Sequence, residues 1–175
     1  MPERPILKGP VAIVGYMGCG KTTVGRLLAR TFRWGFVDLD SDIERAEGRS
    51  IPEIFAYSGE ERFRDIEHRM LLALVEGNAR NRVIACGGGI VVRPENRNLL
   101  ENVTTVFLEE SIDVLYENTR GTDRPLRGAG PAEFERRYKE RLPLYKEVAD
   151  FTVKVRGRSP RRVAREILEK VYHGV

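Results

Sequence analysis

A glycine-rich segment between an apolar run and an amphipathic stretch constrains the fold of this chain more than any other feature. It reads GYMGCGKT at residues 15–22 and directly follows PVAIV, a run rich in β-branched residues. From Lys21 to Phe32 the apolar residues fall on one face of a helix. A strand, a glycine-rich loop and a helix in this order predict the first β-α unit of an α/β fold.

The rest of the chain repeats this alternation of strands and helices. Short apolar or β-branched runs predict strands at 10–14, 36–40, 82–86, 104–109 and 151–155. Periodic segments predict helices at 21–32, 50–59, 60–77, 111–118, 131–146 and 160–172, the last of them capped by Ser159. The sequence therefore predicts an α/β fold, a three-layer sandwich in which helices cover both faces of a five-stranded parallel sheet. Ligands of such sheets bind at the carboxyl ends of the strands.

Composition narrows the possible functions. The 175 residues fit one domain, 1–175, and a formal net charge of +4 suits an anionic ligand. Two cysteines and two histidines are too few for a disulfide framework, a zinc site or a histidine metal cluster. No apolar run approaches the roughly 20 residues that span a bilayer, and the opening MPERPILKG lacks the apolar core of a signal peptide. We therefore expect a cytoplasmic protein without a membrane partner.

The segment at residues 15–22 fits the pattern G-x-x-x-x-G-K-[ST] of a phosphate-binding loop, or P-loop. Its glycines let consecutive backbone N–H groups converge on phosphate oxygens, and the helix that follows adds the positive end of its dipole. Lys21 can reach the β- and γ-phosphates, and the Thr22 hydroxyl can ligate Mg²⁺. A plain glycine turn is the alternative, but the strand and helix on either side favour a nucleoside triphosphate site. The expected ATP-binding residues here are Gly18, Cys19, Gly20, Lys21, Thr22 and Thr23.

Further polar residues follow the second strand and flank an arginine. Asp38 and Asp40 close the predicted strand 36–40 as i and i+2, so we expect both to face the same side. One carboxylate would then hold a Mg²⁺ water and the other would face an acceptor hydroxyl, unless both cap the next helix. Arg64 lies near Glu60 and Glu67, which are either plain surface partners or part of a site.

Two loops complete the unusual features. The predicted strand 82–86 ends in Gly87, Gly88 and Gly89 rather than in the Asp or Asp-Glu of many motor and transporter ATPases, and these glycines are either part of a site or only a turn. The segment TRGTDRPLRGAGP, at about 119–131, is polar and basic, as a lid over phosphates would be, or else a solvated connection. No Asn-Lys-x-Asp stretch is present to read guanine. These features favour a kinase that acts on a small molecule.

Together these motifs resemble the shikimate kinase family, within the nucleoside-monophosphate-kinase-like P-loop kinases. The resemblance rests on six segments that occur in the order of that family and span nearly the whole chain. They are GYMGCGKTTVGRLLA, FVDLDSDIE, GRSIPEIFAYSGEERFRDIE, ACGGGIV, DRPL and RLPLY. The resemblance implies a P-loop NTPase fold and transfer of the γ-phosphoryl group of ATP to the 3-hydroxyl of shikimate. It also implies Mg²⁺ as cofactor, a monomer, and a place on the route to chorismate and the aromatic amino acids.

The resemblance also implies roles for individual residues. Arg64 and Arg141 would hold the shikimate carboxylate, with Glu67 orienting Arg64 within a substrate-binding segment at about 38–67. The ring hydroxyls would contact Asp40 and the glycines Gly87, Gly88 and Gly89. Mg²⁺ would bind Thr22 directly and Asp38 through water. The expected catalytic residues are Lys21, Asp40 and Arg124, and Arg120, Arg124 and Pro160 would join the ATP site.

Other interpretations remain open on the sequence alone. They are gluconate kinase or another small-metabolite kinase, a regulatory ATP-binding module without transfer activity, and a nucleic-acid-binding protein. The last is not expected, because the basic residues are scattered among acidic ones. A separate hypothesis concerns Cys19 and Cys86, which should lie near the phosphate end of the site. Cys19 would be open to oxidants when ATP is absent, or both thiols would be buried and inert.

Overall fold

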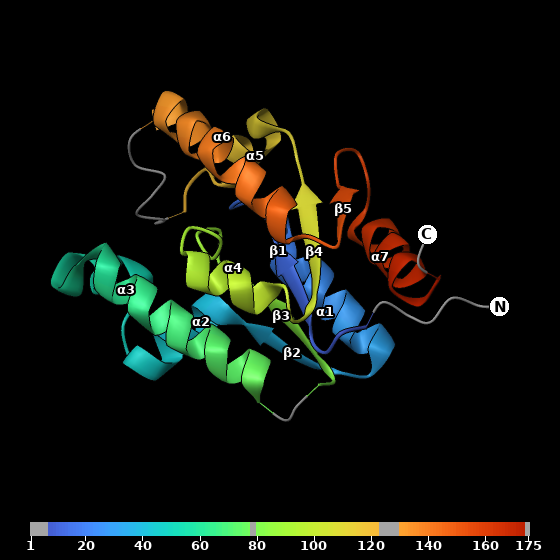
Figure 1. Cartoon of the computed structure of the whole chain (residues 1–175). Coiled ribbons are helices and arrows are strands. Elements are labelled where there is room, and N and C mark those ends of the chain that lie inside the picture. The colour runs from blue at the N-terminus through green and yellow to red at the C-terminus, as the bar shows by residue number, and fades with distance from the viewer. Residues whose placement is uncertain (1–6, 78–79, 123–129, 174–175) are drawn as a thin grey trace.

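The computed structural model describes residues 7–77, 80–122 and 130–173, and its centre is a parallel sheet (Figure 1). The strands are β1 (Val11–Val14), β2 (Gly35–Asp38), β3 (Arg82–Ala85), β4 (Thr104–Glu109) and β5 (Phe151–Lys154). Their order in the sheet is β2-β3-β1-β4-β5, and every neighbouring pair is parallel. The predicted five-stranded parallel sheet is confirmed.

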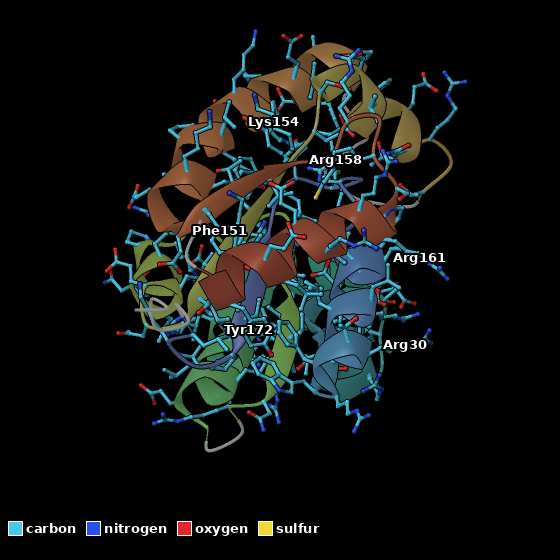
Figure 2. All side chains as sticks on the ribbon, turned by 90° about the vertical axis from the view of Figure 1, so that its right-hand side faces the viewer. Arg30, Phe151, Lys154, Arg158, Arg161 and Tyr172 are labelled. Atoms are coloured by element: carbon cyan, nitrogen blue, oxygen red, sulfur yellow. The ribbon has the colours of Figure 1, made fainter. Side chains whose placement is uncertain are left out.

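Helices cover both faces of this sheet. They are α1 (Lys21–Phe32), α2 (Leu39–Glu47), α3 (Ile51–Glu76), α4 (Pro94–Leu100), α5 (Ile112–Asn118), α6 (Gly130–Val148) and α7 (Pro160–His173). On one face α7 packs against α1, as Figure 2 shows, with Arg161 near the start of α7 and Tyr172 near its end. On the other face α3 packs against α4, and α6 contacts β4 (Figure 1). The predicted three-layer sandwich is confirmed.

The core follows from this layering. All four residues of β1 are fully buried, because a central parallel strand is covered by helices on both faces. Ile13 of β1 lies opposite Ala85 of β3 and Val106 of β4. The loops that leave β1 and β3 therefore start side by side at the carboxyl edge of the sheet. No helix within the described ranges has the length and apolarity needed to cross a bilayer.

The second strand ends at Asp38, and this corrects the predicted placement of Asp40. Asp38 is the N-cap of α2, where its Oδ1 accepts a hydrogen bond from the Ser41 N–H at 3.3 Å. A carboxylate that satisfies a first-turn N–H starts a helix at this point, so Asp40 lies in the first turn of α2. The predicted strand position of Asp40 is wrong and the capping alternative holds for Asp38, but both carboxylates line the same cleft, as the expectation that they face one side requires.

The helices predicted at 50–59 and 60–77 are confirmed. They form the two halves of α3, which is kinked at Gly59, whose φ of 76° favours glycine. Helices α2 and α4 are not predicted from the sequence, because nine and seven residues carry too little periodicity. The predicted cap of α7 is confirmed, since the Ser159 hydroxyl accepts from the Arg162 N–H at 3.4 Å.

A capping box holds the N-terminus of α3, the helix that carries Arg64. The Glu53 N–H donates to the Ser50 Oγ at 3.4 Å, and the Ser50 N–H donates to the Glu53 Oε2 at 2.7 Å. Each residue thus satisfies a backbone donor that the helix leaves unpaired.

Replacing this cap should destabilise the protein. Ser50→Ala should lower the free energy of unfolding by about 1 kcal/mol, the usual effect of losing a serine cap. Ser58→Ala, an exposed position within α3, is the matched control and should change it little. Chemical denaturation of both variants measures the difference, and equal stability of the two would contradict a capping role for Ser50.

Candidate active site

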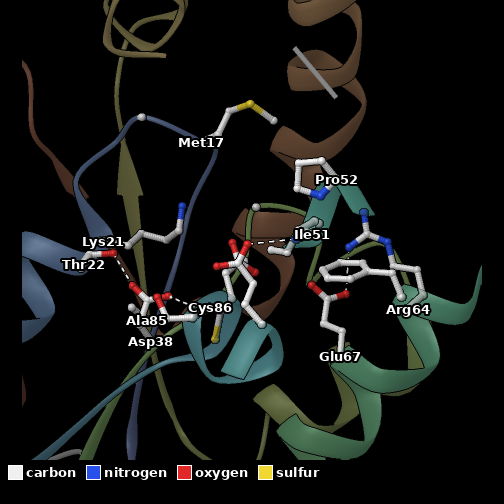
Figure 3. Close-up of a pocket in the computed structure, with 18 of the residues that line it drawn as sticks. Met17, Lys21, Thr22, Asp38, Ile51, Pro52, Arg64, Glu67, Ala85 and Cys86 are labelled. Atoms are coloured by element: carbon white, nitrogen blue, oxygen red, sulfur yellow. Dashed lines mark hydrogen bonds and ion pairs between the residues drawn. The ribbon is translucent and has the colours of Figure 1, made fainter. Parts of the chain in front are cut away.

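A cleft of about 640 Å³ opens at the carboxyl edge of β1, β2 and β3. Figure 3 shows side chains of the P-loop, of the turn after β2 and of α3 gathered around it. It brings together most of the predicted site residues, namely Gly18, Gly20, Lys21, Thr22, Asp38, Asp40, Arg64, Gly87, Gly88, Gly89 and Arg141. These residues come from distant parts of the sequence and meet because the parallel strands end at one edge.

The P-loop folds so that its lysine turns back over the loop. Gly18 and Gly20 have φ values of 87° and 92°, which favour glycine, and α1 begins directly after them. The Lys21 ammonium donates to the backbone oxygens of Gly15 at 2.8 Å and Tyr16 at 3.0 Å. Within the described part of the chain Lys21 forms no ion pair, so its charge is available to an anionic ligand.

Thr22 and Asp38 offer oxygen ligands at one side of the cleft. The Thr22 hydroxyl donates to the Asp38 Oδ2 at 2.5 Å, a contact drawn as a dashed line in Figure 3. Mg²⁺ prefers oxygen ligands and usually takes one or two from the protein, with phosphate and water completing its shell. No group of three or more His, Cys, Asp or Glu gathers as a metal site among the residues described. The pair therefore fits a Mg²⁺ bound together with phosphates.

The glycine triplet, residues 87–89, is tightly surrounded, and each member meets a different part of the cleft. A Cβ on Gly87 would lie 2.6 Å from the Asp40 Oδ1, and one on Gly89 would lie 2.3 Å from two nitrogens of Arg64. A Cβ on Gly88 would come to 3.3 Å from the backbone nitrogen of Met17 in the P-loop. The triplet is therefore more than a turn, because side chains here would displace groups that line the cleft.

Arg64 and Glu67 form a buried ion pair on α3, to the right in Figure 3. The Arg64 Nη1 donates to the Glu67 Oε2 at 2.9 Å, and the two residues are 5% and 0% exposed. The Arg64 Nη2 also donates to the Oε1 of Glu60, an exposed residue one helical turn earlier, at 3.1 Å. Burial excludes the interpretation of Arg64 and Glu67 as plain surface partners.

The pair retains unused hydrogen-bonding capacity. The Arg64 Nε and the Glu67 Oε1 are buried and have no hydrogen-bond partner among the described residues. Burial raises the pKa of the Glu67 carboxyl, and the neighbouring Arg64 partly offsets that effect. A buried polar atom left unpaired is costly, so each of these two atoms has room for one further hydrogen bond, with water or with a polar ligand.

Arg141 of α6 supplies a second buried guanidinium. It is 8% exposed, its Nη1 donates to the backbone oxygen of Gly88 at 3.2 Å, and its guanidinium lies 5.7 Å from the Tyr16 ring centre. Within the described ranges it pairs with no carboxylate, whereas Glu67 is the only fully buried carboxylate that lines the cleft there. Further carboxylates that line the cleft are only half-buried, namely those of Asp38, Asp40 and Glu44. The suitability for a carboxylate ligand therefore rests on the Arg141 guanidinium, which no carboxylate of the described residues neutralises.

Other predicted residues lie elsewhere. Thr22, Thr23 and Pro160 line a second cavity of about 510 Å³ between α1 and the start of α7. Arg120 lies outside the lining of both cavities within the part of the chain that the structure covers, and it pairs with Glu117 at 2.8 Å. Arg124 and most of the predicted lid at 119–131 fall outside the described residues, so the lid and the role of Arg124 stay predictions.

Both cysteines are buried near the phosphate end. Cys19 is 6% exposed, and its Sγ lies 3.8 Å from the Lys21 ammonium. Cys86 follows β3, and burial raises the pKa of its thiol. Such burial favours the inert alternative over the redox hypothesis, which stays a prediction.

Sequence reasoning missed the apolar wall of the cleft. Across the cleft from the P-loop, the lining includes four apolar residues of α3, namely Ile51, Pro52, Phe55 and Phe63. The signal lay in the segment SIPEIF, where more apolar residues cluster at the helix start than one buried face requires. An apolar wall beside charged groups suits a ligand with a carbon ring.

Comparison with known proteins agrees with this site. The family model described as "Shikimate kinase" matches residues 17–172. The shikimate kinase of Marinomonas sp. (strain MWYL1) is 40% identical over 171 residues, which cover 95% of this chain and 94% of that protein. A solved structure, the shikimate kinase from Acinetobacter baumannii in complex with shikimate, has a TM-score of 0.88 at 35% identity. It covers 96% of this chain, which in turn covers 93% of that one.

A more distant structure shares the fold alone. A gluconokinase from Sinorhizobium meliloti 1021 has a TM-score of 0.57 at 18% identity, covering 94% of this chain and 92% of that chain. The gluconate kinase alternative is therefore not favoured. The family model, the relatives and the cleft agree, and the chain belongs to the shikimate kinase family.

Proposed function

We propose that this chain transfers the γ-phosphoryl group of ATP to the 3-hydroxyl of shikimate, giving shikimate 3-phosphate and ADP. Membership of the family supports the reaction. The observation that carries the proposal is the placement of two buried guanidiniums, Arg64 and Arg141, in the same cleft as the P-loop lysine. Such a cleft binds a small carboxylate beside a nucleoside triphosphate.

We assign the substrate carboxylate to Arg64 and Arg141. A planar guanidinium pairs with two carboxylate oxygens at once, and burial strengthens that attraction. Glu67 holds Arg64 in place through the 2.9 Å contact, so the guanidinium is oriented before the ligand arrives. Asp40 and the backbone of the glycine triplet are assigned to the ring hydroxyls.

The transfer step depends mainly on positioning and on charge. The oxygen of the 3-hydroxyl forms a bond to the γ-phosphorus while the bond from that phosphorus to the β-γ bridging oxygen breaks. Asp40 accepts the hydroxyl proton, and ADP leaves. Lys21 turns from the backbone oxygens of Gly15 and Tyr16 to the phosphates and neutralises the transferring group.

Mg²⁺ fits the pair formed by Thr22 and Asp38. We assign one ion there, bound to the Thr22 hydroxyl and, through water, to Asp38. When bound, the ion neutralises phosphate charge. The second cavity, with Thr23 and Pro160, is assigned to the adenosine end of ATP. Arg120 and Arg124 complete the ATP site in this proposal.

The proposal also covers the domain organisation, the oligomeric state and the location of the chain. The chain acts as one domain and a monomer in the cytoplasm, with residues 38–67 as the substrate-binding segment and 119–131 as a lid. Neither a nucleic acid nor a membrane is part of the proposal.

The direct test is release of ADP in a coupled assay. The chain should release ADP when ATP, Mg²⁺ and shikimate are all present, and little when shikimate is left out. Gluconate in place of shikimate is the control for the alternative acceptor. ADP release that does not depend on shikimate, or that gluconate supports better, would contradict the proposal.

A conservative change at the clamp should separate the two substrates. Arg64→Lys should raise the KM for shikimate by roughly tenfold or more, because an ammonium cannot form two parallel contacts with a carboxylate. The KM for ATP should change little. Arg69→Lys, an exposed position on the same helix, is the matched control. An equal rise of both KM values in Arg64→Lys would point instead to a structural role.

A further inference from the structure

The backbone oxygen of Gly88 accepts hydrogen bonds from two side chains of α6. One donor is the Arg141 Nη1 at 3.2 Å, and the other is the Tyr145 hydroxyl, in a short contact. The two residues are four apart, so they lie on the same face of the helix. The Gly88 oxygen therefore connects α6 to the glycine triplet at the point where Arg141 enters the cleft.

Tyr145 is held rigidly. It is 0% exposed, and its ring stacks on the Phe107 ring of β4 with centroids 5.1 Å apart and an angle of 16° between the planes. Phe107 is itself fully buried in the sheet. The hydroxyl thus has a fixed position relative to the sheet, and it fixes the Gly88 oxygen in turn.

A second donor on this oxygen matters once a ligand competes for Arg141. A carbonyl oxygen has two lone pairs, and here both are used. The guanidinium is drawn toward an anionic ligand, because a contact with a carboxylate is stronger than one with a neutral carbonyl. With Tyr145 in place, the Gly88 oxygen keeps a donor while Arg141 turns to the ligand.

The same contact also orients a donor of the glycine triplet. All described peptide bonds are trans, and in a trans peptide the C=O and the following N–H point in opposite directions. Fixing the Gly88 oxygen therefore fixes the direction of the Gly89 N–H, one of the backbone groups assigned above to a ring hydroxyl.

We propose that Tyr145 is a positioning residue for the acceptor substrate, which acts through Gly88 on Arg141 and on the Gly89 N–H. This inference rests on the proposed function. It assigns to Tyr145 no contact with the substrate and no part in binding ATP. The loss of its hydroxyl should therefore weaken the capture of shikimate selectively.

The test compares two tyrosines of the same helix. Tyr145→Phe removes the hydroxyl that donates to the Gly88 backbone oxygen. Tyr138→Phe is the matched control, because its hydroxyl also donates to a backbone oxygen, that of Glu110 at 3.1 Å, away from the glycine triplet. For each variant we would measure thermal stability, the KM values for shikimate and ATP, kcat, and shikimate binding by calorimetry.

Tyr145→Phe should raise the KM and the dissociation constant for shikimate by about fivefold to tenfold, the usual effect of one lost hydrogen bond. Its KM for ATP should stay within about twofold of the wild-type value, and Tyr138→Phe should leave both KM values within about twofold.

Shikimate binding by Tyr145→Phe as tight as that of the wild type would overturn the inference. An equal loss of affinity for shikimate and for ATP would overturn it as well, and so would a Tyr145→Phe chain that does not fold. Either result would mean that the hydroxyl contributes to the stability of the whole protein. A wild-type chain that binds no shikimate would instead contradict the proposed function.

Discussion

Three consecutive residues without side chains allow four parts of this molecule to meet at one edge of the sheet. The glycine triplet packs against Asp40 of α2, the backbone of the P-loop and the guanidinium of Arg64, while α6 holds the Gly88 oxygen. Because β3 lies beside β1, the triplet leaves the sheet next to the P-loop. This close approach places the two buried guanidiniums that we assign to the substrate carboxylate in one cleft with the P-loop, and a small-molecule kinase needs its two substrates held side by side in this way.

The same edge concentrates buried charge, and the helices on either side hold it in place. Glu67 fixes Arg64 from α3, and Tyr16 of the P-loop connects to α6 by donating to the Phe134 oxygen at 3.1 Å. The Arg141 guanidinium lies over the Tyr16 ring, so the same tyrosine contacts both α6 and the second guanidinium. An ion pair as buried as Arg64 with Glu67 is a poor source of stability, which is consistent with a role in binding.

Much of this arrangement could be predicted from the sequence, because its signals are local. The alternation of strands and helices predicts the sheet, and the P-loop pattern predicts the positions of Lys21 and Thr22. The sequence around Asp38 is compatible both with a strand that continues to residue 40 and with a helix that Asp38 caps, and no local pattern decides between the two. Contacts between distant segments, such as that of Tyr145 with Gly88, have no local signal, because they depend on how α6 lies across the sheet.

The most direct test of this account is the affinity of a Gly89→Ala variant for shikimate, measured by calorimetry. The backbone of Gly89 suits alanine, but the added methyl group would occupy the place of the Arg64 guanidinium. Gly35→Ala, where the nearest atom to the new Cβ is 3.8 Å away, is the control. We predict that Gly89→Ala loses about tenfold or more in shikimate affinity while still binding ATP, because displacing Arg64 removes a charged contact. Shikimate affinity in Gly89→Ala equal to that of the control would contradict it.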